Sequence, residues 1–238
     1  MNLYFIVEGK RTEPILYRSW IPQLLPTFRE ISRIEDAVEE GLGDTFYLIA
    51  GLGYPAYEHR IRNAIKDCAA TSKPFHLVVC VDAEDVSVSE RILKNEKIIR
   101  DARAIENVPL LPFSIVIADC CIETWLLGNA KVIKRNPDSE DLRAYLEHYD
   151  VAAFDPEKMP AKTGDRNRAD THLRYLQAVF RERNMYYTKK HPADASEPHY
   201  LKALVNRASV DQGDGTRHLR SFSVLLSLCD SLNAVEKA

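Results

Sequence analysis

Acidic residues stand where apolar runs end in this 238-residue sequence. Glu8, Asp82 and Asp119 each follow such a run directly, and Glu84 comes two residues after Asp82. A single acid in this position commonly starts a turn or caps a helix. Several acids at one sheet edge could instead bind a hard cation, because carboxylate oxygens are the ligands that Mg²⁺ prefers. A carboxylate-held Mg²⁺ suits phosphodiester chemistry.

The spacing of Asp82 and Glu84 matters for such a site. In extended backbone their side chains point to the same side, with Cα atoms about 6.5 Å apart, so both can share one cation. If the strand ends one residue earlier, Asp85 is the second ligand instead. Glu8 could complete the site or move a proton, a role that requires burial or neighbouring acids to raise its pKa.

The elements that must position these acids alternate between strands and helices. Continuous apolar runs predict strands at 2–7, 45–50, 76–81 and 113–118, each followed by helical spacing. Strands that are buried on two sides and alternate with helices predict an α/β fold, with a mainly parallel sheet of about four strands flanked by helices. Ligands of such sheets gather at the carboxyl ends of the strands.

Beyond about residue 130 the strand signal fades. Helical spacing continues at 139–148, 170–183, 200–208 and 219–232. We therefore expect a catalytic core over residues 1–130 and a mostly helical extension over 131–238 that packs on the core.

Glycines follow two of the predicted strands. Gly9 comes directly after Glu8 and allows a tight turn, and the exposed Lys10 beside it either contacts phosphate or is simply solvated. Gly51 and Gly53 precede a helix, as in a dinucleotide-binding turn, but the third glycine and the later acid of that motif are missing. Two readings stay open, a structural turn and a turn whose amides approach a phosphate.

A basic tract runs from Lys158 to Lys190. It holds nine Lys or Arg and three Asp or Glu, a local charge of +6 in a chain whose net charge is -3. Basic residues mixed with tyrosines suit phosphate neutralisation and base stacking. The alternative is a solvated helix face whose tyrosines pack inward. The residues with a predicted role in nucleic-acid binding are Arg166, Arg168, Lys189 and Lys190.

Composition excludes several classes of protein. A hydrophobic content of 45% with 28% charged residues is that of an ordinary globular protein, and no apolar stretch approaches the roughly 20 residues of a membrane span. The first residues lack the pattern of a signal peptide, so we expect a cytoplasmic protein. The five cysteines and seven histidines have no zinc-motif spacing, and no cysteine has an evident basic setting, so we expect neither a zinc site nor a disulfide framework.

Two strings carry a family resemblance, FIVEGKRTE at 5–13 and VCVDAE at 79–84. They resemble the Toprim superfamily, whose members include topoisomerases, primases and the nuclease domains of OLD proteins. More narrowly, they resemble small stand-alone Toprim-like proteins of the RloB kind. The resemblance extends through 49–55, 122–127, 187–190 and Ser221-Phe222.

The resemblance implies a Toprim fold in which Glu8 is the general acid or base and the acidic pair binds Mg²⁺ or Mn²⁺. It also implies a nuclease that cleaves DNA or RNA in bacterial anti-phage defence, with an ATPase as a partner protein, and it adds Glu123 as a supporting residue. The family usually has Asp-x-Asp, whereas this chain has Asp82-x-Glu84. The glutamate side chain is about one methylene longer and can still bind the ion. The spacing favours Glu84 as the second ligand, and Asp85 is the alternative.

Three functional hypotheses follow. The first is a Mg²⁺-dependent nuclease. The second is a non-catalytic Toprim-like subunit that binds nucleic acid or an ATPase. This hypothesis stays open because Glu84 stands where the family usually has an aspartate. The third is primase-type nucleotidyl transfer, for which no zinc module or nucleotide-specific element is found. A homo-oligomer is compatible with each of them.

Overall fold

The computed structural model describes residues 1–39, 42–71, 73–211, 213 and 216–235. Its strands form one five-stranded sheet in the order β2-β3-β1-β4-β5, in which β1 pairs in parallel with β3 and β4, and β2 pairs in parallel with β3. The predicted α/β fold with a mainly parallel sheet is confirmed. The strands are β1 (Asn2–Val7), β2 (Phe28–Glu30), β3 (Asp44–Ala50), β4 (His76–Asp82) and β5 (Phe113–Ala118).

The short strand β2 was not predicted from the sequence. It has three residues, of which only Phe28 is buried, so it carries no apolar run that could reveal it. None of the described helices is long and apolar enough to cross a membrane. The helices are α1 (Thr12–Leu24), α2 (Ala56–Ala70), α3 (Val88–Ile105), α4 (Ile122–Leu126), α5 (Glu140–His148), α6 (Arg168–Glu182), α7 (Pro198–Ser209) and α8 (Arg220–Val235).

Contacts divide the chain into two compact units. The first contains Met1–Val81, Val88–Ile117 and the chain from Leu228 on, and the second contains Asp82–Ser87 and Ala118–Ser227. A single boundary at residue 130 therefore does not describe the contacts. The chain leaves the first unit at the end of β4, re-enters it at α3, leaves it again after β5 and re-enters it within α8.

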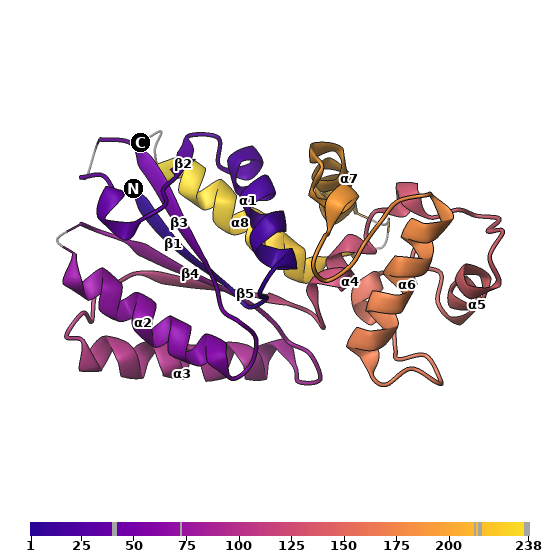
Figure 1. The fold of residues 1–238 in the computed structure, drawn as a ribbon, viewed down its shortest axis with the longest axis horizontal. Helices are drawn as coiled ribbons and strands as arrows, with labels where there is room; N and C mark the ends of the chain where they lie inside the picture. Colours follow the sequence, from indigo (N-terminus) through magenta and orange to yellow (C-terminus); the bar gives the residue numbers. More distant parts are fainter. Residues whose placement is uncertain (40–41, 72, 212, 214–215, 236–238) are drawn as a thin grey trace. The chain divides into compact units, whose positions relative to one another are not determined.

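The first unit is a sheet with helices on both faces. Helices α2 and α3 lie on one face, and α1 with the C-terminal half of α8 lies on the other (Figure 1). All six residues of the central strand β1 are buried. Burial on both faces is the reason that this strand appears in the sequence as a continuous apolar run rather than an alternating one.

The strand order places a topological switch point between β1 and β4. From β1 the chain passes through α1 to β2 and β3 on one side of the sheet, and from β4 it passes through α3 to β5 on the other side. The two connections diverge at the carboxyl ends of β1 and β4. Open parallel sheets bind their ligands at such a point.

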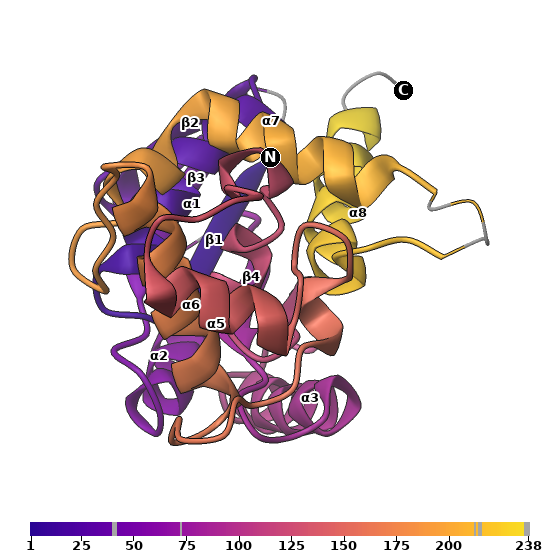
Figure 2. The same ribbon diagram turned by 90° about the vertical axis from the view of Figure 1, so that its right-hand side faces the viewer.

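The second unit contains no named strand among its described residues. Helices α5 and α6 lie side by side in it (Figure 2). Tyr145 of α5 stacks on Tyr175 of α6, with ring centroids 5.0 Å apart. In the core, the buried hydroxyl of Tyr200 donates to the carbonyl of Leu126 at 2.7 Å. The predicted helical character of this part of the chain is observed in α5 to α8.

Candidate functional site

Glu8 lies where β1 leaves the sheet. Its N–H donates to the carbonyl of Cys80 in β4 at 3.0 Å, which continues the β1–β4 pairing by one residue. Its own carbonyl accepts a hydrogen bond from the N–H of Gly53 at 2.8 Å. The residue is only 6% exposed. The predicted acid is therefore buried, and its backbone is hydrogen-bonded on both sides.

Two buried side chains of the first unit, Arg91 and Tyr57, were not predicted as site residues. Arg91 of α3 donates to the hydroxyl of Tyr57 at 3.3 Å. Burial raises the pKa of Tyr57 and the charge of Glu8 adds to this rise, whereas Arg91 opposes it. A signal for Arg91 was present, because it shares helical spacing with Asn95 and Ile98 on the buried face of α3. An arginine on an apolar helix face needs a polar partner.

The glycine turn after β3 holds the end of β1. The N–H of Gly51 donates to the carbonyl of Val7 at 2.6 Å, and the N–H of Gly53 donates to the carbonyl of Glu8. Both amides thus donate to the protein's own backbone. A structural turn therefore accounts for these two N–H groups without a bound phosphate. A Cβ at Gly51 would meet the Val7 carbonyl oxygen and the Tyr57 Cβ, both at 2.9 Å.

Gly51→Ala is therefore expected to lower the free energy of unfolding by about 1 to 3 kcal/mol, the usual cost of overpacking against atoms that cannot move freely. Urea unfolding followed by circular dichroism measures it. The matched control is Gly53→Asn, because nothing lies within 4 Å of an added Cβ at Gly53. Its φ of +79° adds only a backbone cost, which is smaller for asparagine than for most residues. Equal stability of the two variants would contradict the packing argument.

Asp82 and Glu84 do not share one extended strand. Strand β4 ends at Asp82, and Glu84 has a φ of +55°, in the left-handed region. The N–H of Glu84 donates to the carbonyl of Cys120 at 2.7 Å, which fixes this turn within the second unit. Asp82 is half-buried, while Glu84 and Asp85 are exposed. Glu84 was preferred over Asp85 on the condition that the backbone is extended through Glu84. The structure does not meet this condition, so both residues remain candidates.

Gly9 is constrained by a close approach rather than by an unusual turn. It has no positive φ. Its N–H donates to Oε2 of Glu13 at 2.7 Å, and an added Cβ would lie 2.4 Å from the other carboxylate oxygen. Glu13 was not predicted as a site residue, although it is a buried acid in the first turn of α1. Lys10, in contrast, is exposed.

Glu123 is held inside the second unit. It is 2% exposed and lies in the short helix α4, where its Oε1 accepts a hydrogen bond from the hydroxyl of Tyr187 at 2.9 Å. This contact joins two segments of the family resemblance that are 64 residues apart. Glu123 thus has a structural partner in addition to its predicted supporting role.

Tyr187→Phe is expected to destabilise the protein by about 1 to 3 kcal/mol, because it removes a donor from a buried carboxyl group. Thermal or urea unfolding tests this. Tyr186→Phe is a close control, since Tyr186 is the preceding residue and is 63% exposed. Similar losses in both variants would show that the hydrogen bond to Glu123 contributes nothing measurable.

Ser221 connects several segments of the second unit. Its Oγ accepts hydrogen bonds from the N–H of Asp119 at 3.0 Å and from Nε1 of Trp125 at 2.7 Å. It donates to Oε1 of Glu157 at 2.5 Å. The ring of Phe222 packs against Trp125 with centroids 5.2 Å apart. Ser221 and Phe222 therefore have a structural role, because they hold the end of β5 and the start of α4 in place.

Most arginines of the basic tract bind the protein itself. Arg168 donates to Oδ1 of Asp119 and to the carbonyl of Met159, each at 2.9 Å, and also to the carbonyl of Glu157. The guanidinium of Arg168 is therefore held by these three acceptors, whereas the predicted contact with nucleic acid requires it to bind a phosphate. Arg166 is 80% exposed but pairs with Asp170 at 2.8 Å.

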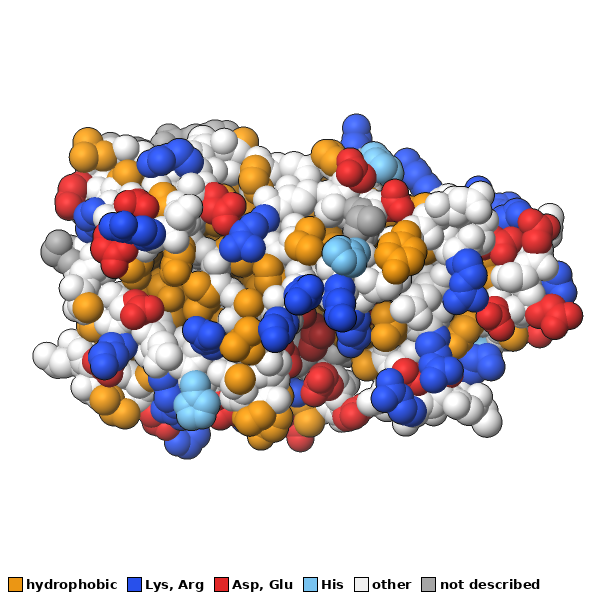
Figure 3. Space-filling model, viewed as in Figure 1, with side chains coloured by type: hydrophobic (Ala, Val, Ile, Leu, Met, Phe, Trp, Pro, Cys, Tyr) orange, Lys and Arg blue, Asp and Glu red, His pale blue; other side chains and the backbone are white. Residues whose placement is uncertain are grey.

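Two further arginines of α6 form ion pairs with acids of α5 and α6. Arg181 of α6 pairs with Asp141 of α5 at 3.2 Å, and Arg174 pairs with Asp170 at 3.0 Å. Figure 3 shows Lys and Arg intermixed with Asp and Glu over these helices. Lys189 and Lys190 are exposed beside the short bridge between Thr188 and His191. Both lysines therefore stay candidates for phosphate contact on the basis of their exposure.

A cluster of soft ligands was missed by the sequence analysis. Cys120, Cys121 and His172 are all buried, and one potential ligand atom from each lies within 4.8 Å of the others. Hydrogen bonding from Cys121, and then from His172, lowers the pKa of the Cys120 thiol, with Arg168 adding to the effect. The expectation that no cysteine has a basic setting was therefore wrong. No spacing rule could have found this cluster, because His172 is 51 residues from Cys121 along the chain.

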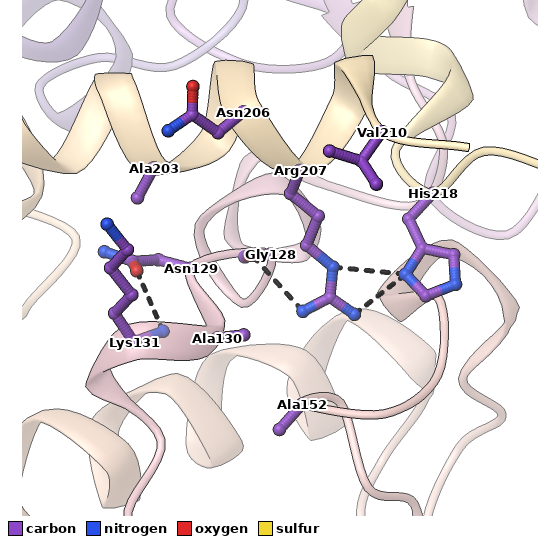
Figure 4. A pocket seen from close by; sticks show the side chains of 10 residues that line it. All are labelled: Gly128, Asn129, Ala130, Lys131, Ala152, Ala203, Asn206, Arg207, Val210 and His218. Carbon is purple, nitrogen blue, oxygen red and sulfur yellow. Dashed lines mark hydrogen bonds between the residues drawn. The ribbon is translucent and has the colours of Figure 1, made fainter. Parts of the chain in front are cut away.

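A hollow of about 300 Å³ lies elsewhere in the second unit. Arg207 reaches from α7 to its wall, where it donates to the carbonyl of Gly128 and to Nδ1 of His218 (Figure 4). The acids considered above do not line it. No protein-family model, curated protein or solved structure matches this chain.

Proposed function

We propose that this protein is a Mg²⁺-dependent phosphodiesterase of the Toprim type that cleaves DNA or RNA. The observation that carries the proposal is the position of two acids in the sheet. Glu8 directly follows β1, and Asp82 is the last residue of the neighbouring parallel strand β4. The two strands flank the topological switch point, where sheets of this kind bind ligands.

The donor set fits a hard cation. Asp82, together with Glu84 or Asp85, would hold the Mg²⁺, and Mn²⁺ suits the same oxygen ligands. The half-buried position of Asp82 and the exposure of the other two carboxylates leave room for water and a phosphate. The ion, when bound, supplies a Lewis acid that stabilises charge on the phosphoryl oxygens.

Glu8 supplies the proton transfer in this proposal. Cleavage requires a proton for the leaving oxygen or the removal of one from the attacking group. Glu8 combines a carboxyl group with 6% exposure and a backbone fixed by Cys80 and Gly53. A fixed backbone favours catalysis, because a proton carrier must stay within hydrogen-bond reach of its target.

Nuclease assays on the full chain test the proposal. Labelled single-stranded DNA, duplex DNA and RNA are incubated with Mg²⁺, with Mn²⁺ and with EDTA. We expect cleavage of at least one of them that requires the divalent ion and returns when the ion is added back after EDTA. Cleavage that persists in EDTA would contradict the metal site.

A non-catalytic nucleic-acid-binding subunit is the second candidate. The observation that favours it is the left-handed turn at Glu84, which separates this carboxylate from the extended strand that ends at Asp82. Such a subunit would retain labelled nucleic acid in a gel-shift assay and leave it intact with either metal. Binding by the same protein without cleavage therefore selects this candidate over the nuclease.

A further inference from the structure

The buried cysteines and histidine of the second unit form a group with metal-ligand chemistry. Cys120 and His172 are each 0% exposed, and Cys121 is 3% exposed. Their candidate ligand atoms lie within 4.8 Å of one another. Thiolate sulfur and imidazole nitrogen are the ligands that Zn²⁺ selects in proteins, whereas Mg²⁺ selects oxygen. This group therefore differs in kind from the carboxylates considered above.

The backbone brings the two adjacent cysteines together. In an extended chain, neighbouring side chains point to opposite sides. Cys120 instead has a φ of +77°, which breaks the alternation between the end of β5 and the start of α4. This conformation is unfavourable for a residue other than glycine, so the surrounding structure must hold it. The N–H of Glu84 bonds to the carbonyl of Cys120 at 2.7 Å and helps to hold the turn.

Thr124 orients the third member of the group. Its Oγ1 lies 2.6 Å from Nδ1 of His172 and 3.6 Å from Sγ of Cys121. It also accepts a hydrogen bond from the N–H of Cys121 at 3.3 Å. The other ring nitrogen of His172 lies 3.4 Å from the carbonyl of Met159, at the limit of a hydrogen bond. A hydroxyl that fixes both a thiol and an imidazole resembles the outer hydrogen-bonding groups that orient metal ligands.

Charge balance favours a divalent ion at this position. A lone charge in a buried site is costly unless it is neutralised. Zn²⁺ displaces the protons of the thiols that bind it, so two thiolates and one neutral imidazole would carry a total charge of -2, which the divalent cation cancels. We propose that Cys120, Cys121 and His172 bind one Zn²⁺ per chain and so join the start of α4 to α6. Three protein ligands leave the fourth tetrahedral position for a water molecule or one further ligand.

Metal analysis of the full chain tests this proposal without reference to cleavage. Because the group is buried, the protein is refolded with Zn²⁺, desalted, and measured for zinc by mass spectrometry. We expect one zinc ion per chain in the wild type and in the control Cys68→Ser, which alters another buried cysteine, in α2. We expect Cys120→Ser and His172→Gln to bind less than a tenth as much. Zinc at wild-type stoichiometry in both of these variants would overturn the assignment.

Cobalt provides a second readout in the unaltered chain, in case the variants fail to fold. Refolding with Co²⁺ should produce an intense thiolate-to-cobalt charge-transfer absorption together with the visible bands of a tetrahedral ion. Bound metal should slow the alkylation of Cys120 and Cys121 in the folded chain, and it should leave the alkylation rate of Cys68 unchanged. No charge-transfer absorption, or a disulfide between the two adjacent cysteines in place of bound metal, would overturn the proposal.

Discussion

Asp82→Asn is expected to reduce Mg²⁺-dependent cleavage by on the order of 10³-fold while leaving the fold intact, because it removes a charged oxygen ligand from the end of β4. Glu8→Gln should reduce it by on the order of 10² to 10⁴-fold, the usual contribution of a positioned proton carrier. Both side chains keep their volume in these variants. Initial cleavage rates at saturating Mg²⁺ measure the loss, and circular dichroism checks the fold.

The control for these variants is Asp141→Asn. Asp141 lies at the surface of α5, and its side chain is 70% exposed. This variant should cleave like the wild type. Wild-type rates in both Asp82→Asn and Glu8→Gln would remove the proposed site. Since the described geometry no longer separates Glu84 from Asp85, the rates of Glu84→Gln and Asp85→Asn should also be compared. The variant with the larger loss of Mg²⁺-dependent cleavage identifies the second ligand.

Glu157 is expected to make the protein less stable as the pH rises from about 4.5 to 7. Burial raises the pKa of this carboxyl to about 7, with Asp155 adding to the effect and the hydrogen bonds from Ser221 opposing it. The folded state then binds more protons than the unfolded state between these two pKa values. Stability is therefore greatest below the unfolded pKa and falls as the pH rises through the folded pKa, by about 3 kcal/mol in total from this group.

Glu157→Gln tests this pH dependence. The amide keeps the shape of the side chain and does not titrate, so the variant should lose the fall in stability between pH 4.5 and 7 that Glu157 contributes. Urea unfolding at pH 5 and pH 7.5, for wild type and variant, gives the difference. Glu147→Gln is the control, because Glu147 is exposed on α5 and should leave the wild-type slope unchanged. A slope that is identical in wild type and Glu157→Gln would refute the assignment to this group.

Much of the fold could be predicted because its signals are local. Continuous apolar runs mark β1 and β4, since strands buried on two faces have no polar side. Helices α5, α6, α7 and α8 were predicted to within a few residues, because each presents apolar residues at helical spacing. The strand β2 could not be found, because a three-residue element at a sheet edge leaves no periodic pattern.

The predicted acids depended only in part on local signals. Parallel strands that are buried on two sides end in acids here, so the fold class alone predicts that Glu8 and Asp82 stand at strand ends. The position of Glu84 does not follow in this way. It depends on the left-handed turn and on the hydrogen bond to Cys120, a residue 36 positions further along the chain.

By itself, the sequence determined the α/β class, the buried strands and the acids that end them, because hydrophobic periodicity and strand ends are encoded by neighbouring residues. Only the tertiary structure decided that Arg168 binds Asp119 and that His172 joins Cys120 and Cys121. These contacts link residues about 50 positions apart, and their partners are chosen by the packing of α6 against α4. No local pattern of residue types carries that information.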